Sequence, residues 1–236
     1  MSEKTIRNKT DPLDICYDLS SGKFEVGVDE VGRGPLFGRV YTAAVILPKD
    51  SSFDHALMKD SKRFHSEKKI CDAAQYIKEN AIAWFVSYED ETVIDNINIR
   101  QATLKSMHNS IKGAIIKHAG NINTISDVDP TDYMLLIDGN DFKPLTYLHN
   151  DSFIGINHTC VEGGDNKYTA IAAASIIAKV ARDEYIKELC SANPELIDRY
   201  NIGSNKGYGA AVHINGIKEH GISKWHRKTY GICENY

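Results

Sequence analysis

The sequence predicts an α/β domain with a mixed β-sheet that is flanked by helices and followed by a small helical appendage. Three observations support this fold class. Strand patterns come first, over residues 24–30 and 39–47. Strand and helix patterns then alternate as far as residue 189, and two shorter helical patterns follow, over residues 194–200 and 210–220. Leading strands with a later strand–helix alternation are typical of a mixed sheet that is covered by helices.

Each expected strand is rich in apolar or β-branched residues. In the first strand, Phe24, Val26 and Val28 alternate with polar residues or glycine, as on a strand with one buried face. Pro48 stops the second strand, because proline donates no hydrogen bond to a sheet. The remaining expected strands are residues 81–88, residues 133–137 and a short strand within 152–161.

The expected helices are recognised by the spacing of their apolar residues. Residues 68–80 follow Ser66, whose hydroxyl is typical of an N-cap. Residues 99–119 place large apolar side chains on one stripe. Residues 169–189 carry many alanines, which let that helix lie close against a sheet. Residues 60–62, before the first helix, are expected to form a loop.

Length and composition indicate one globular domain, since 236 residues with 42% hydrophobic residues are enough for a sizeable core. No apolar run approaches the length of about 18 residues that a membrane span needs, and residues 1–12 lack the apolar centre of a secretory signal. The five cysteines are scattered and form no C-x-x-C pair, which argues against a zinc site and fits a reducing compartment. We therefore expect a cytoplasmic protein without a membrane partner.

The net charge of −4 does not decide whether the protein binds nucleic acid. The distribution of charge matters more than the sum. Residues 201–236 carry five lysine or arginine residues against two acidic residues. A basic C-terminal stretch therefore accompanies an acidic remainder of the chain, and acids that bind cations lose part of their formal charge.

The segment that says most about function begins where the first strand ends. Asp29 and Glu30 are adjacent carboxylates, which repel each other and resist desolvation at the end of an apolar strand. A divalent cation relieves both costs, since hard oxygen ligands suit Mg²⁺ or Mn²⁺. Gly32 and Gly34 let the backbone approach a ligand closely, and Arg33 between them adds a fixed positive fork. A metal beside a tight glycine turn indicates chemistry on a phosphate.

Two further acids follow later in the chain. Asp138 comes directly after the strand over residues 133–137, so it lies at the sheet edge where α/β proteins place their sites. Asp165 follows two glycines and precedes the helix over residues 169–189. If the strands of Asp29 and Asp138 are neighbours, the carboxylates meet. Two metal ions bound there would activate an attacking water and stabilise the leaving oxygen.

Other interpretations of these acids stay open at this point. Asp138 begins an Asp-Gly-Asn sequence that is typical of a turn, and Asp165 suits an Asx-turn or the approach to a helix cap. Asp183 is a rival fourth acid. It lies in the middle of a helix beside Lys179 and Arg182, so a solvated or ion-paired role is expected for it.

The segment over residues 27–36, together with residues 43–47, resembles the opening motif of ribonuclease HII. Further segments match motifs of that family in the same order, and the resemblance covers about residues 24–231. The matching segments are residues 59–62, 98–103, 136–140, 172–183 and 206–209, then His213, and finally residues 226–230.

The resemblance implies a ribonuclease H-like fold and an endonuclease that cuts the RNA strand of RNA–DNA hybrids. It also implies that the enzyme nicks duplex DNA at embedded ribonucleotides and leaves 5′-phosphate and 3′-hydroxyl ends. By motif position, the catalytic acids that hold two divalent ions, Mg²⁺ or Mn²⁺, would be Asp29, Glu30, Asp138 and Asp165. The chain lacks the lysine that commonly precedes the Gly-Asp of the family, which leaves the position of the fourth acid open.

The same resemblance implies which residues contact nucleic acid. They would be Gly32, Arg33 and Gly34 at the 2′-hydroxyl and its phosphate, Tyr208 on the sugar beyond the RNA–DNA junction, and Lys62 and Lys206. A 2′-hydroxyl both donates and accepts hydrogen bonds, so backbone groups in a glycine turn are able to distinguish RNA from DNA. A packed turn residue at Tyr208, and ordinary surface lysines at the other two positions, are the alternatives.

Three regions are expected along the chain. Residues 1–22 form a flexible N-terminal extension, residues 23–190 the ribonuclease H-like catalytic domain, and residues 191–236 a C-terminal helical substrate-binding region. The histidines at 213, 220 and 226 are expected to be structural or to face phosphate, and His226 with Arg227 to cap a helix end. We expect a monomer that acts in DNA replication and ribonucleotide excision repair.

Three other functions compete with a hybrid-specific endonuclease. A catalytically weak protein that only marks ribonucleotides would not need all four acids. A phosphate-binding protein with an anion nest at Gly32-Arg33-Gly34 is disfavoured, because the G-x-x-x-x-G-K-[ST] sequence is absent. Another two-metal nuclease on the same fold, such as a 3′–5′ exonuclease, leaves the Gly-Arg-Gly and Lys-Gly-Tyr motifs unexplained.

Overall fold

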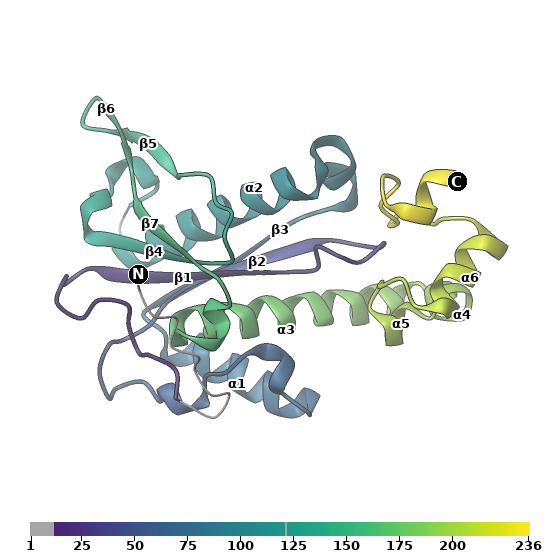
Figure 1. The fold of residues 1–236 in the computed structure, drawn as a ribbon, viewed down its shortest axis with the longest axis horizontal. Coiled ribbons are helices and arrows are strands. Elements are labelled where there is room, and N and C mark those ends of the chain that lie inside the picture. The colour runs from purple at the N-terminus through teal and green to yellow at the C-terminus, as the bar shows by residue number, and fades with distance from the viewer. Residues whose placement is uncertain (1–11, 121) are drawn as a thin grey trace, which may run out of the picture.

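The computed structural model describes residues 12–120 and 122–236, and its centre is a five-stranded sheet (Figure 1). The strands lie in the order β3-β2-β1-β4-β7. Their bounds are β1 Phe24–Val31, β2 Val40–Ile46, β3 Ala83–Glu89, β4 Tyr133–Asp138 and β7 Asn157–Val161. Strand β2 is antiparallel to β1 and β3, whereas β4 is parallel to β1 and to β7. The predicted mixed sheet is therefore confirmed.

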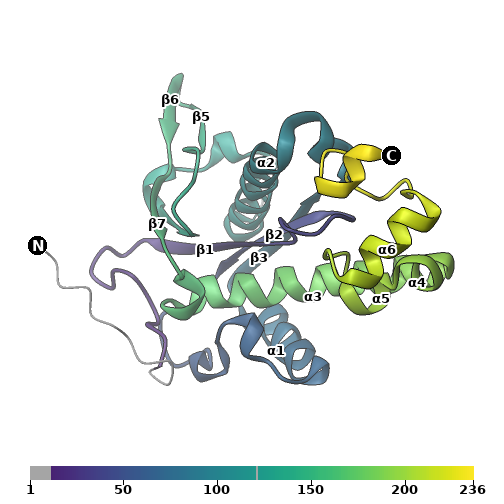
Figure 2. The same cartoon turned by 45° about the vertical axis from the view of Figure 1, so that its right-hand side comes forward.

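Helices cover both faces of this sheet. Helix α2 (Glu91–Ala119) lies on one face, and helices α3 (Thr169–Ala192) and α1 (Glu67–Asn80) lie on the other (Figure 2). Successive residues of a strand point to opposite faces. Accordingly, Ala44 and Ile46 of β2 pack in the core beneath α2, while the intervening Val45 packs in the core beneath α1 and α3.

Helix α3 approaches the sheet closely because small residues meet on both sides. Its buried alanines face β1, where Gly27 has no side chain. A Cβ atom at Gly27 would lie 2.2 Å from the carbonyl carbon of Ala170. The alanine-rich helix thus packs as its sequence predicts, and Gly27 sets the distance between β1 and α3.

The C-terminal region packs beyond the end of α3 as a group of short helices (Figure 1). These are α4 (Glu195–Tyr200), α5 (Ile202–Asn205), α6 (Ala211–His220) and a final 3₁₀ helix (Gly231–Asn235). They share an apolar cluster in which Leu196 and Ile217 contact the group around Phe37 and Ile186. Because Phe37 belongs to the loop after β1, this cluster fastens the C-terminal region to the early part of the chain.

The long helix α2 differs from the expectation in where it begins. It starts at Glu91, where the carboxylate of Asp90 accepts a hydrogen bond from the backbone of Val93. It is interrupted at Asn98, whose φ of 66° is not helical. The side chain of Asn98 accepts a hydrogen bond from the backbone N–H of Gln101 and so caps the second part of the helix.

Two other segments also differ from the expectation. Within residues 152–161 there are two strands, because β6 (Ser152–Gly155) pairs with β5 (Thr146–His149) in a hairpin, whereas β7 joins the central sheet. Residues 60–62, expected as a loop, lie in a short 3₁₀ helix (Ser61–Arg63) that Asp60 caps.

Part of the expected N-terminal extension lies against the domain, while residues 1–11 of it fall outside the described residues. The backbone N–H of Asp14 donates to the carbonyl of Lys167, and that of Thr169 donates to the carbonyl of Asp14. Leu13 packs against the core beneath α3. Within the described ranges, no helix is both long and apolar enough to cross a membrane.

Replacing Gly27 with alanine should destabilise the protein by about 3 kcal/mol, since the new methyl group meets backbone atoms that cannot move independently. Urea unfolding followed by circular dichroism measures this change. In the matched variant Gly203→Ala, the added Cβ makes only an ordinary contact, 3.6 Å from Ile197, and stability should change little. Equal unfolding midpoints for the two variants would contradict the close approach.

Candidate active site

Four acids meet at one edge of the sheet because they lie where the pairing of two parallel strands ends. Val28 of β1 and Ile137 of β4 form the last pair between these two strands, so Asp29 and Asp138 follow side by side directly after it. The carboxylate of Asp138 accepts a hydrogen bond of 2.6 Å from the backbone N–H of Gly164. This bond draws the short 3₁₀ helix Gly164–Asn166, with Asp165, toward the ends of β1 and β4. The conditional expectation that these strands are neighbours is thus confirmed.

The acids lie close enough together for the charge of one to shift the pKa of another. Burial, followed by the charges of Glu30 and Asp138, raises the pKa of Asp29 well above its usual range. Burial also raises the pKa of Glu30, where Arg33 opposes the effect and Asp138 adds to it. For Asp165, burial and then the charge of Asp138 raise the pKa. The acids therefore form a desolvated, mutually repelling cluster.

Lys62 faces this cluster. Partial burial disfavours its ammonium form, but the carboxylates of Asp60, Asp165, Asp29 and Asp138 outweigh that effect and raise the pKa of Lys62. The position of Lys62 beside the acids suits a group that contacts a phosphate held there. The 3₁₀ helix that carries Lys62 is anchored by a hydrogen bond of 2.9 Å between the hydroxyls of Ser61 and Ser175.

The donor set fits a hard divalent cation. Burial and mutual repulsion make the acids costly to ionise, and a cation would offset both effects. In residues 12–120 and 122–236, no three acidic, histidine or cysteine side chains are arranged so that they could already hold a metal ion. Carboxylate oxygens would therefore have to turn toward the ion when it binds.

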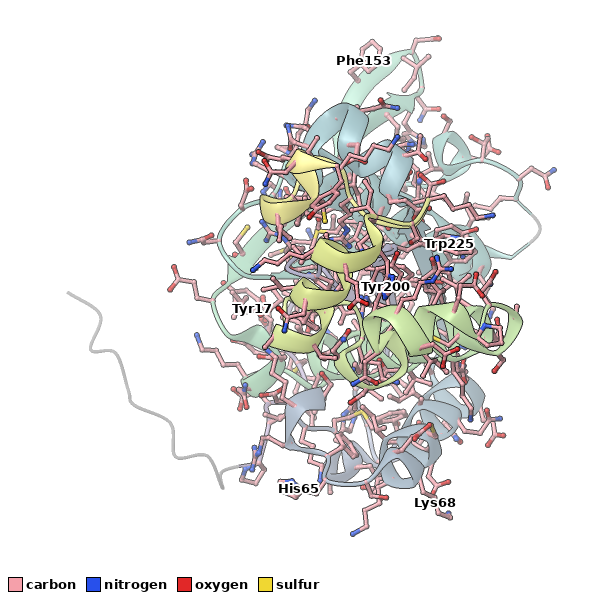
Figure 3. All side chains as sticks on the ribbon, turned by 90° about the vertical axis from the view of Figure 1, so that its right-hand side faces the viewer. Tyr17, His65, Lys68, Phe153, Tyr200 and Trp225 are labelled. Atoms are coloured by element: carbon pink, nitrogen blue, oxygen red, sulfur yellow. The ribbon has the colours of Figure 1, made fainter. Side chains whose placement is uncertain are left out.

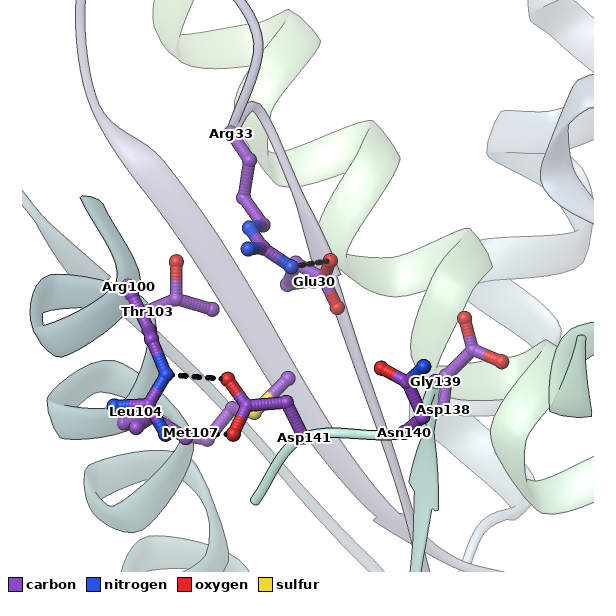
Figure 4. Close-up of a pocket in the computed structure, with 10 residues that line it drawn as sticks. All are labelled: Glu30, Arg33, Arg100, Thr103, Leu104, Met107, Asp138, Gly139, Asn140 and Asp141. Atoms are coloured by element: carbon purple, nitrogen blue, oxygen red, sulfur yellow. Dashed lines mark hydrogen bonds and ion pairs between the residues drawn. The ribbon is translucent and has the colours of Figure 1, made fainter. Parts of the chain in front are cut away.

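A pocket of about 70 Å³ opens between Glu30 and Asp138 (Figure 4). Two ion pairs lie in it. Arg33 contacts Glu30 at 3.4 Å, and Arg100 binds Asp141 through two hydrogen bonds of 2.6 and 2.7 Å. Arginines thus flank the acids on the side of α2, where they suit the negative charge of a nucleic-acid backbone.

The Gly32–Arg33–Gly34 turn is held from behind by a buried arginine. Arg227 donates from Nη2 to the carbonyl of Gly32, from Nη1 to that of Arg33 and from Nε to that of Gly38, over 2.6 to 2.9 Å. The expectation that Arg227 caps a helix end is wrong, because these three carbonyls belong to the loop after β1. Their orientation is fixed by one planar side chain.

The Lys206–Gly209 segment lies beside this turn. Arg182, which is buried, donates from Nη2 to the carbonyl of Lys206, and the backbone N–H of Leu36 donates to the carbonyl of Gly207. A Cβ atom at Gly34 would lie 3.6 Å from the ring of Tyr208, so the ring is next to the turn. With 48% of its surface exposed, Tyr208 is available to a ligand, which argues against a merely packed turn residue.

Two other sequence-based assignments have different outcomes. Asp183 forms an ion pair of 2.7 Å with Lys179, as expected for an acid in the middle of a helix. Lys206 lines a separate cavity between α1 and α3 rather than the pocket at Glu30 and Asp138. Its contact with nucleic acid remains a prediction.

Arg182 and Arg227 were missed as residues of the site. Both are fully buried, at 1% and 0% exposure, and each donates to backbone carbonyls of a loop beside the acids. The sequence shows that both residues are charged but not that they are buried, and an arginine is rarely fully buried unless it is paired. Their partners are carbonyls, which every residue has, and so leave no pattern in the sequence.

Comparisons with known proteins identify the family. The family model described as Ribonuclease HII matches residues 26–232. Ribonuclease HII of Parabacteroides distasonis is 41% identical over 214 residues, which are 91% of this chain and 93% of that protein.

Solved structures show the same fold. The ribonuclease H2 of Pyrococcus horikoshii superposes with a TM-score of 0.64 at 19% identity, over 89% of this chain and 95% of the other. Bst-RNase HIII in complex with Mn²⁺ gives a TM-score of 0.56 at 20% identity, over 85% and 63% of the two chains. The ribonuclease H-like fold is thus confirmed, and with the family model and the sequence identity it follows that this chain belongs to the ribonuclease HII family of hydrolytic endonucleases.

Proposed function

We propose that this enzyme hydrolyses the RNA strand of RNA–DNA hybrids and nicks duplex DNA at embedded ribonucleotides. The observation that carries the proposal is the meeting of three elements at one sheet edge. Asp29 and Asp138 directly follow the last residue pair between β1 and β4, the Gly32–Arg33–Gly34 turn follows β1, and the exposed ring of Tyr208 lies beside that turn. Family membership supports the same activity.

Two divalent ions, Mg²⁺ or Mn²⁺, would be held by Asp29, Glu30, Asp138 and Asp165. When bound, such ions lower the pKa of an attacking water and stabilise the leaving oxygen of an in-line displacement. The protein supplies the rest of the chemistry. Asp29 and Asp165 are buried, while Lys62, Arg33 and Arg100 give the surrounding rim a positive charge.

The Gly32–Arg33–Gly34 turn would recognise the 2′-hydroxyl through its backbone. Gly32 has a φ of 92°, a conformation that favours glycine, and a Cβ atom there would collide with Arg182. Arg227 fixes two carbonyls of the turn, so the turn meets the substrate with backbone donors and acceptors in set positions. A hydroxyl that both donates and accepts is the group that such a surface distinguishes.

Tyr208 would stack on the sugar that follows the RNA–DNA junction. A deoxyribose lies flat against an aromatic ring, whereas an added hydroxyl on that sugar would clash with it. The ring lies beside Gly34, close to the proposed 2′-hydroxyl contact, and this supports such a check. Cleavage on the 5′ side of a single ribonucleotide, with 5′-phosphate and 3′-hydroxyl products, is the outcome that this arrangement favours.

We further propose that the enzyme acts as a monomer in the cytoplasm, in DNA replication and ribonucleotide excision repair. All five cysteines are free thiols, which fits a reducing compartment.

The first test is cleavage of an end-blocked DNA duplex that carries one ribonucleotide, with Mg²⁺ or Mn²⁺ and an all-DNA control. A single cut on the 5′ side of the ribonucleotide is expected. If a long RNA–DNA hybrid is cleaved but this cut is absent, the proposed role of the carboxylates stands and the proposed junction check by Tyr208 is refuted. Binding of both substrates without cleavage would instead support a protein that only marks ribonucleotides.

Replacing Asp138 with asparagine should lower cleavage by roughly a hundredfold or more, since a neutral amide no longer offsets the charge of a cation. Asparagine keeps an oxygen for the N–H of Gly164, so the fold and hybrid binding should persist. A rise in Tm with Mn²⁺ should occur in the wild type and diminish in the variant. Asp183→Asn removes only an ion pair with Lys179 and should cleave normally; substantial turnover by Asp138→Asn would refute its role.

Replacing Tyr208 with alanine should reduce cleavage of the single-ribonucleotide duplex by about tenfold more than cleavage of a long hybrid. The variant Tyr208→Phe keeps the ring and should behave like the wild type on both substrates. The ratio of kcat/KM for the two substrates is the quantity to compare. An equal loss on both substrates would remove junction reading by this ring.

A further inference from the structure

A chain of hydrogen bonds runs through the C-terminal region and ends at the backbone of Tyr208. His213 and His226 are buried, and their Nε2 atoms lie 3.0 Å apart. On one side, Nδ1 of His213 lies 2.9 Å from the carbonyl oxygen of Tyr208. On the other side, Nδ1 of His226 lies 2.9 Å from the backbone nitrogen of Ser223. Neither histidine approaches the acids, so the proposed chemistry does not account for the pair.

The direction of this chain follows from its one unambiguous donor. The backbone N–H of Ser223 only donates, so Nδ1 of His226 accepts and carries no proton. A neutral His226 then carries its proton on Nε2 and donates to Nε2 of His213. His213 in turn keeps its proton on Nδ1 and donates to the carbonyl of Tyr208.

The surroundings keep both imidazoles neutral. Burial and then the neighbouring His213 lower the pKa of His226 to about 3, and burial lowers the pKa of His213 as well. The rings of Tyr200 and Phe37 pack against His226, with centroid distances of 4.9 and 5.1 Å. Tyr200 lies among the C-terminal helices (Figure 3).

We propose that His213 and His226 are positioning residues that hold Tyr208 for junction reading, an inference that rests on the proposed function. The carbonyl of Tyr208 accepts from His213 and, at 2.8 Å, from the backbone N–H of Ala210, so both of its lone pairs are used. The residues before it, Lys206 and Gly207, have positive φ angles of 53° and 83°.

About half of the surface of Tyr208 is exposed, so neighbouring side chains hold only part of its ring. It lies next to Gly34 and 5.9 Å from the guanidinium carbon of Arg182. Its direction is therefore set mainly by its backbone, which the two histidines fix. Loss of the chain should leave the acids in place while the ring loses its set direction.

Two substitutions at His213 separate hydrogen bonding from packing. Asparagine places an amide N–H near the former Nδ1 and is able to donate to Tyr208, whereas phenylalanine fills the ring volume and donates nothing. The measurement is kcat/KM for the single-ribonucleotide duplex divided by that for a long hybrid. His213→Phe should lower this ratio about tenfold, and His213→Asn should restore most of it.

Tyr200→Phe is the matched control, since it removes a hydrogen bond of 3.1 Å to the carbonyl of Gly221 in the same cluster and leaves the chain to Tyr208 intact. Its ratio should equal that of the wild type. A His213→Phe enzyme that keeps the wild-type ratio, whether or not its activity on both substrates falls equally, would overturn the proposal. So would an asparagine variant no better than phenylalanine.

Nitrogen NMR of the histidine side chains in the intact protein tests the chain independently of cleavage. His226 should be protonated at Nε2 and His213 at Nδ1, and the opposite tautomer at either residue would overturn the proposal. A wild-type protein that cuts hybrids but not the single-ribonucleotide duplex would instead contradict the junction reading on which the proposal rests. The two failures are thus distinguished.

Discussion

The loops beside the acid cluster depend on the contacts of one buried guanidinium, that of Arg227. A cation without solvent is costly unless its donors are satisfied, and burial lowers the pKa of Arg227 to about 10. The carbonyls of Gly32, Arg33 and Gly38 supply partial negative charge from three directions. A glycine-rich loop alone would have no fixed conformation, and the arginine alone would be unfavourable. Each is stable because the other is present.

Arg182 is a second buried arginine, and it holds the Lys206–Gly209 loop in the same way. Its guanidinium donates to the carbonyl of Lys206, and its stem fills the space that a side chain at Gly32 would need. The backbone also joins the two loops directly, since the N–H of Leu36 donates to the carbonyl of Gly207. The acids on the sheet are therefore rigid because of the core, while the loops beside them are rigid because of buried arginines that reach across the chain.

Features that arise from local pattern were predictable from the sequence. Alternation identified β1, and the density of apolar residues identified β4. Acids at the ends of both expected strands predicted that Asp29 and Asp138 would meet if these strands were neighbours. Long-range bonds to backbone carbonyls were not predictable, because any residue offers a carbonyl and no spacing marks it. For that reason the role of Arg227 was mistaken, and the break at Asn98, where a side chain competes for the helix backbone, was unforeseen.

The separation between Arg227 and the turn that it holds has a consequence for synthesis. The bond from Arg227 to Gly32 spans 195 residues of sequence, so the turn leaves the ribosome long before its partner exists. Contacts of such long range form late in folding, because the intervening chain must be ordered first. All four acids are already present in a nascent chain that still lacks the arginine. The loop geometry that we propose to distinguish RNA from DNA is thus acquired last, and a product truncated before residue 227 would carry the acids without it.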